Sequence, residues 1–99
     1  MIKVEVTKKN ISIVGHANFD EYGKDIVCAA ASSIVLTSIE AIASFDIKSI
    51  DVIEKQNKLE IIINKEDNIT KKLIDNMLNC LNELVKKYPK NIRIINKEE

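Results

Sequence analysis

The sequence predicts an α+β domain in which two helices pack against a mostly antiparallel sheet, with the elements in the order ββαββαβ. Short runs that alternate apolar and polar residues or are rich in Ile and Val are typical of half-buried strands. Two longer stretches have the composition or the periodicity of helices. At 99 residues the chain suffices for one modest core. No linker or low-complexity run divides it, so we expect a single domain over residues 1–99.

The first element is a β-hairpin. Residues 2–6 alternate Ile and Val with charged side chains, and residues 11–14 form a second strand-like run after the polar residues 8–10. This second strand ends at Gly15. The only histidine of the chain, His16, is therefore predicted to lie at a strand tip and not in the apolar stripe of a helix.

The next element is a helix over residues 26–45. Asp25 is a good candidate for its N-cap, and Glu40 is the only charged residue of the helix. A helix that is apolar nearly all round must be covered on more than one side. Its several Ser and Thr residues and Glu40 argue against a transmembrane span. We therefore expect it to pack on the sheet and also against a neighbouring element or a second subunit.

The second half of the chain predicts another hairpin, a helix and a last strand. Residues 50–53 and 59–63 are strand-like and are joined by a polar turn. Residues 69–88 place apolar side chains at the three-to-four spacing of an amphipathic helix. Pro89 ends this helix, and residues 92–95 form a short final strand.

Composition limits the partners and the compartment of the protein. Fifteen basic and fifteen acidic residues cancel, so no global field attracts nucleic acid or an anionic membrane, and direct nucleic-acid binding is not expected. The N-terminus lacks the unbroken apolar run of a secretory signal, so we expect a cytoplasmic protein. Its two cysteines are then expected to be thiols. Cys80, on or beside the stripe of the second helix, is predicted to be buried and inert.

The stretch of residues 15–33 carries the candidate chemistry. Cys28 is the third residue of the predicted first helix, where free backbone N–H groups and the helix dipole favour an anion. His16 is the only imidazole that can activate the thiol. A crossing from strand through loop to helix can bring the two together. A buried structural cysteine with an incidental loop histidine is the alternative interpretation of the same residues.

Two other uses of these residues are disfavoured. A metal site built from His16, Asp20, Asp25 and Cys28 lacks the tight ligand spacing of known sites, so no metal and no cofactor is expected. A thiol redox sensor would need a resolving cysteine close to Cys28 in sequence. The chain has none there, because its second cysteine is Cys80.

The same stretch resembles the signature of a known family. The pattern GHA, then a short variable loop, then GxDxVCAAxS is similar to that of the Prp family, the bacterial ribosomal-processing cysteine proteases. The resemblance implies a homodimeric cysteine endopeptidase that removes the N-terminal extension of a large-subunit ribosomal protein. The matching residues are Gly15, His16, Ala17, Gly23, Asp25, Val27, Cys28, Ala29, Ala30 and Ser32.

The resemblance also assigns roles. Cys28 is implied as the nucleophile and His16 as the general base. Asp25 is expected first as the helix cap, with orientation of His16 and substrate contact left open, while Ser32 either supports the site or packs the helix. Backbone N–H groups at the helix start are the natural oxyanion donors.

The residues between His16 and the helix resemble a loop that family members place over the active site. Gly23 is its candidate hinge, and Phe19 or Tyr22 either covers a substrate side chain or packs against the sheet. One alternative function is retained. It is a non-catalytic ribosome-associated or RNA-contacting module in which the same motif is purely structural.

Overall fold

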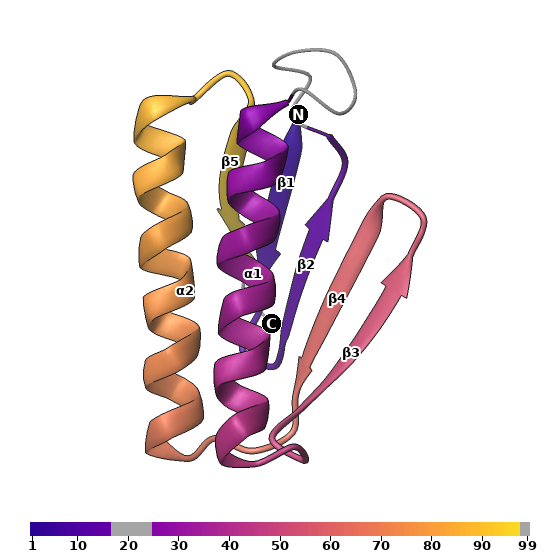
Figure 1. The fold of residues 1–99 in the computed structure, drawn as a ribbon, viewed down its shortest axis with the longest axis vertical. Coiled ribbons are helices and arrows are strands. Elements are labelled where there is room, and N and C mark those ends of the chain that lie inside the picture. The colour runs from indigo at the N-terminus through magenta and orange to yellow at the C-terminus, as the bar shows by residue number, and fades with distance from the viewer. Residues whose placement is uncertain (17–24, 98–99) are drawn as a thin grey trace.

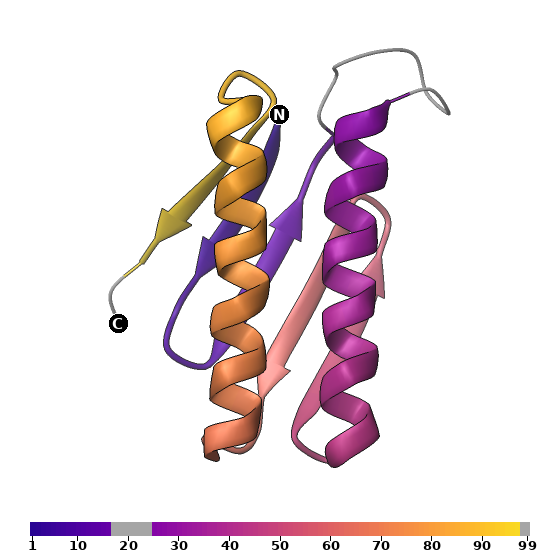
Figure 2. The same cartoon turned by 60° about the vertical axis from the view of Figure 1, so that its left-hand side comes forward.

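The computed structural model describes residues 1–16 and 25–97. Both helices lie on one face of a five-stranded sheet (Figures 1 and 2). This arrangement confirms the predicted α+β class and the order ββαββαβ. The elements are β1 (Ile2–Val6), β2 (Asn10–Val14), α1 (Ile26–Phe45), β3 (Ile50–Lys55), β4 (Lys58–Ile63), α2 (Asn68–Lys87) and β5 (Ile92–Asn96).

The sheet has the strand order β3-β4-β2-β1-β5. All neighbouring strands are antiparallel except β1 and β5, which are parallel. Because side chains alternate between the two faces of a strand, the register decides which of them meet the helices. Val4 lies opposite Ile13, and Ile11 opposite Ile61. The apolar residues of the alternating runs thus share the face that the helices cover.

A single hydrophobic cluster joins the sheet to both helices. Val4, Ile11 and Ile61 contribute fully buried side chains from three adjacent strands. From α2, Met77 and Leu81 are equally inaccessible to solvent. Burial of this kind is the main favourable term in folding, and it fixes the positions of the strand and helix ends that form the site.

Helix α1 is long and apolar enough to cross a membrane by length and composition alone. In this structure, however, it packs on the sheet beside α2, as core helices of folded domains also do (Figures 1 and 2). Its other side is open in the single chain, where Ile26 is 54% and Phe45 67% exposed. Packing on the sheet is therefore confirmed, and a second subunit on the open side stays a prediction. The buried residues of α1 are Val27, Ala31, Val35 and Ile42.

Helix α2 is amphipathic, as predicted, but Cys80 is not buried. The side chains of Ile74, Met77 and Leu81 lie in the core, whereas Cys80 is exposed. At 3.6 residues per turn, this position falls at the edge of the stripe that Met77 and Leu81 define, on its solvent side. The prediction of a buried thiol was wrong for this reason. Both Cys28 and Cys80 are free thiols.

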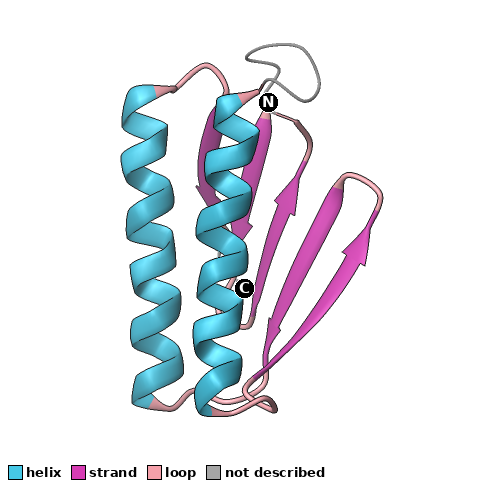
Figure 3. Cartoon of the chain, in the orientation of Figure 1, coloured by secondary structure: helices cyan, strands magenta, loops and turns pink. Residues whose placement is uncertain are grey.

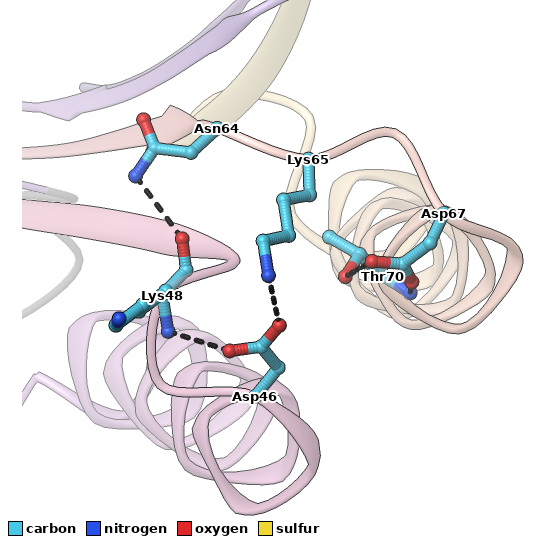
Figure 4. Close-up of polar contacts among 6 residues, drawn as sticks. All are labelled: Asp46, Lys48, Asn64, Lys65, Asp67 and Thr70. Atoms are coloured by element: carbon cyan, nitrogen blue, oxygen red, sulfur yellow. Dashed lines mark hydrogen bonds and ion pairs between the residues drawn. The ribbon is translucent and has the colours of Figure 1, made fainter.

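Polar contacts join the end of α1 to the start of α2 (Figure 4). The carboxylate of Asp46 accepts a hydrogen bond from the Lys48 amide at 2.9 Å and forms an ion pair with the Lys65 ammonium. Asp67 caps α2 by accepting from the Thr70 amide at 2.8 Å. These contacts lie at the end of the molecule opposite to the start of α1.

Candidate active site

Three chain segments lie toward the end of the molecule where α1 begins (Figures 1 and 3). They are the end of β2, the start of α1 and the turn between β3 and β4. A cleft of about 450 Å³ lies among them, and both His16 and Cys28 line it. Ile13, Val35 and Leu59 provide apolar lining. The structure thus brings the two predicted catalytic residues to one solvent-accessible cleft.

Cys28 is placed by the cap of α1. Asp25 has an extended backbone, and its Oδ1 accepts hydrogen bonds from the amides of Val27 and Cys28, each at 3.0 Å. This confirms the predicted N-cap. Cys28 therefore lies in the first turn of the helix, where the macrodipole stabilises negative charge. Its side chain is half-buried and packs against the core, so the position of the thiol is set by both the cap and the packing.

The cap also changes the expectation for the oxyanion. We expected backbone N–H groups at the helix start to stabilise it. The amides of Val27 and Cys28 already donate to Asp25, and the Ala29 amide donates to the Asp25 carbonyl oxygen at 3.1 Å. In this structure, these three amides are engaged within the helix and its cap and are not directed at a substrate.

His16 follows the end of β2, as the strand pattern predicted. Gly15 has a φ of +92°, and a Cβ atom there would lie 2.6 Å from the Met1 carbonyl oxygen. Both features require glycine at this position. The Gly15 amide donates to the Asn57 carbonyl oxygen at 2.9 Å. The chain therefore turns sharply before His16 and presents the imidazole at the exposed mouth of the cleft.

Asn57 is a candidate site residue that the sequence did not predict. Its Oδ1 lies 2.6 Å from His16 Nε2, and it also lines the cleft. An Asn in a two-residue hairpin turn signals tolerance of a positive φ, and Asn57 has a φ of 61°. Its approach to His16, however, depends on the pairing of β2 with β4, where Val14 lies opposite Lys58. A local pattern does not contain that long-range pairing.

The remaining predicted residues differ in what the structure shows. Ser32 is exposed and lines the cleft one helical turn after Cys28. Phe19, Tyr22 and Gly23 lie outside the described residues. Within residues 1–16 and 25–97, no three His, Cys, Asp or Glu side chains gather closely enough to hold a metal ion.

Comparison with known proteins identifies the family of this chain. The family model described as cysteine protease Prp matches residues 1–93. A ribosomal processing cysteine protease Prp from Staphylococcus aureus is 30% identical over 103 residues, which cover 95% of this chain and 97% of that protein. The chain is also similar to two crystal structures of the S. aureus ribosomal processing protease Prp. The complex with a covalently linked product peptide has a TM-score of 0.92 at 28% identity, covering 98% of this chain and 100% of that chain. The complex with a substrate peptide has a TM-score of 0.86 at 27% identity, with the same coverage.

The fold and the family match are those of a cysteine protease. More specifically, the chain belongs to the Prp family of ribosomal processing cysteine proteases. The resemblance drawn from the motif is thereby confirmed, and it extends from the motif to nearly the whole chain.

Proposed function

We propose that this chain is an endopeptidase that removes the N-terminal extension of a large-subunit ribosomal protein by thiol catalysis. The observation that carries the proposal is that Cys28 and His16 line one cleft in a chain of the Prp family. The described S. aureus relative was crystallised with a covalently linked product peptide. A covalent intermediate on this chain's own thiol is consistent with that relative.

The reaction follows from the two side chains. His16 takes the thiol proton, and Cys28 Sγ attacks the scissile carbonyl carbon to form a tetrahedral adduct. As this collapses, the C–N bond breaks, and His16 delivers the proton to the leaving amine. A water molecule, deprotonated by His16, then hydrolyses the thioester and restores the thiol. No other reagent is required.

The lining of the cleft also suits a peptide substrate. Its apolar lining, from Val35 and Leu59 among others, offers a surface on which apolar side chains of the substrate lose contact with water. Glu54, Lys55 and Lys58 line it as well. We propose that the apolar surface holds residues next to the scissile bond, while these charged side chains contact flanking polar groups.

We further propose a cytoplasmic homodimer. A compartment that keeps thiols reduced preserves the Cys28 nucleophile. On α1, Ile26 and Phe45 are more than half exposed in the single chain, although a surface helix of an isolated domain is ordinarily polar on its outer side. A second copy is the occupant that we propose for this surface.

The proposal is tested by a cleavage assay. Purified protein is incubated with a peptide that spans the junction between the N-terminal extension and the rest of the ribosomal protein. The masses of the products are measured by mass spectrometry. Cys28→Ala is expected to lower the rate by about 10³-fold or more. Cys80→Ala is the matched control and is expected to leave the rate within about twofold, because surface positions away from a site have small effects.

Two outcomes of this assay would contradict the proposal. Equal activity of the Cys28 variant would remove the thiol from the chemistry. Lack of cleavage by the unmodified, folded protein would favour the alternative of a non-catalytic ribosome-associated or RNA-contacting module.

A further inference from the structure

We propose that Asn57 is a positioning residue that fixes the tautomer and the ring orientation of His16, and that Cys28, His16 and Asn57 act as one unit. This inference rests on the proposed function, because it refines how His16 serves as the base. It is carried by a side-chain contact and by two features of the backbone around that contact.

The contact determines which ring nitrogen carries the proton. His16 Nε2 lies 2.6 Å from Asn57 Oδ1, and an amide oxygen is only an acceptor. The hydrogen bond therefore requires a proton on Nε2. In a neutral imidazole the other nitrogen, Nδ1, is then unprotonated and has the chemistry of a base. Under this proposal, Nδ1 is the atom that takes the proton from the Cys28 thiol, which lines the same cleft.

The same contact persists through the reaction. When Nδ1 gains the thiol proton, the imidazolium keeps its proton on Nε2 and continues to donate to Asn57 Oδ1. The amide dipole then faces a cation and stabilises it. The hydrogen bond holds the ring in place both before and after proton transfer, which is what a positioning residue must do. A Cys, His and Asn set of this kind is a chemically known solution for thiol proteases.

The backbone holds Asn57 where this contact is made. Its φ of 61° is a left-handed conformation that Asn tolerates better than most residues. Its carbonyl oxygen accepts from the Gly15 amide at 2.9 Å. One residue therefore binds both the main chain before His16 and the ring of His16 itself. These two contacts join the tip of β2 to the β3–β4 turn beside the cleft.

A purely structural role is a poor explanation of this contact. His16 and Asn57 are both exposed, and neither belongs to the hydrophobic cluster. The strands on either side are already paired through the β2–β4 register. Removal of the amide side chain is therefore expected to leave the fold intact and to affect the imidazole.

The first test uses nuclear magnetic resonance and needs no activity. The chain has one histidine, so protein labelled with ¹⁵N-histidine gives a single imidazole spin system. At a pH where the ring is neutral, the proton is expected on Nε2 and protected from exchange with water. In Asn57→Gly, which keeps the positive φ, exchange of this proton is expected to be about tenfold faster or more. A proton on Nδ1, or unchanged exchange in the variant, would overturn the proposal.

The second test is kinetic and uses a control in the same turn. Asn57→Gly is expected to lower kcat by about 10- to 100-fold with little change in KM, because base catalysis and not binding is impaired. Asn57→Asp retains an acceptor oxygen and is expected to recover most of the loss. Gln56→Gly also introduces glycine into the turn but removes no contact to His16, so its kcat is expected to stay within about twofold.

The two tests separate the two proposals. If Asn57→Gly retains full kcat and the exchange of the Nε2 proton is unchanged, Asn57 has no positioning role even if the protein is a protease. If the unmodified protein cleaves nothing, the proposed function fails, and the resonance experiment still decides whether Asn57 fixes the tautomer of His16.

Discussion

Asp25 is the site residue whose role the sequence left most open. In the structure, its Oδ1 accepts hydrogen bonds from the Val27 and Cys28 amides. The cap therefore orders the turn that carries the nucleophile. On this basis we expect Asp25 to contribute mainly by positioning Cys28.

This role predicts the behaviour of three substitutions. Asp25→Ala is expected to lower the free energy of unfolding by about 0.5–2 kcal/mol, whereas Asp25→Asn keeps a capping oxygen and retains most stability and cleavage. Asp67→Ala is the matched control, because it removes the cap of α2, where Thr70 donates at 2.8 Å, far from the cleft. Urea unfolding and the cleavage assay measure both properties. A stable but inactive Asp25→Asn would show that the charge of Asp25 acts directly in the site.

Single residues were predictable where their signal was local. The strand tip of His16, the cap at Asp25 and the first-turn position of Cys28 all follow from neighbours in sequence. Asn57 was not predictable as a partner of His16, because 41 positions separate them and only strand pairing brings them together. The prediction that Cys80 is buried was wrong for a different reason. A position at the edge of a helical stripe becomes buried or exposed according to where the sheet lies.

At the scale of elements, periodicity predicted every strand and helix of the described residues. The boundaries agree closely because capping and turn residues mark them. Helix α2, for example, was expected over residues 69–88 and runs over Asn68–Lys87, directly after its cap, Asp67. The alternating runs predicted the strands well because one face of the sheet is covered and the register is therefore strongly specified.

The contribution of the Asp46–Lys65 contact, between the end of α1 and the start of α2, to stability depends on pH. The hydrogen bond from Lys65, followed by that from the Lys48 amide, lowers the pKa of Asp46 from its ordinary 3.8. The bond to Asp46 raises the pKa of Lys65 above 10.5. Their contribution to stability is thus present above the ordinary pKa of Asp46 and is lost as the pH falls through the lowered value. It is also lost as the pH rises through the raised pKa of Lys65. Between about pH 5 and 9 it stays constant.

Asp46→Asn is therefore expected to reduce stability slightly at pH 7 and to weaken the fall in stability below about pH 4. Urea unfolding at pH 3, 5 and 7 measures this. Asp75→Asn changes an exposed carboxylate of α2 that forms no ion pair with the other described residues, and it serves as the control. An equal effect of both substitutions would show that net charge, and not the Asp46–Lys65 contact, causes the dependence.

At the scale of the whole molecule, the strand order could not be predicted from the sequence. Nothing local indicates that β5 returns parallel to β1 or that β2 lies between β1 and β4. Yet this order places the β3–β4 turn beside the tip of β2 (Figure 1). Residues of this turn line one side of the cleft. The candidate nucleophile and base could be found from sequence, while the cleft that surrounds them is a product of topology.

The open side of α1 gives the prediction for assembly. Sedimentation at high micromolar concentration is expected to show a dimer. Phe45→Lys is expected to weaken it by about tenfold or more, since it places a charge where the proposed dimer would have an apolar contact. Ile69→Lys alters an exposed apolar residue of α2 and is the control. A protein that sediments only as a monomer would contradict this assignment of the α1 surface.

The central claim, that Cys28 is the nucleophile, is tested most directly within the cleavage assay. Protein quenched with acid during turnover is digested, and the peptides that carry Cys28 and Cys80 are weighed. The scissile carbonyl belongs to the N-terminal extension, so the account predicts this extension as a thioester on Cys28 and the ribosomal protein as the released amine. An acyl group on Cys80, or cleavage that continues in Cys28→Ala, would contradict it.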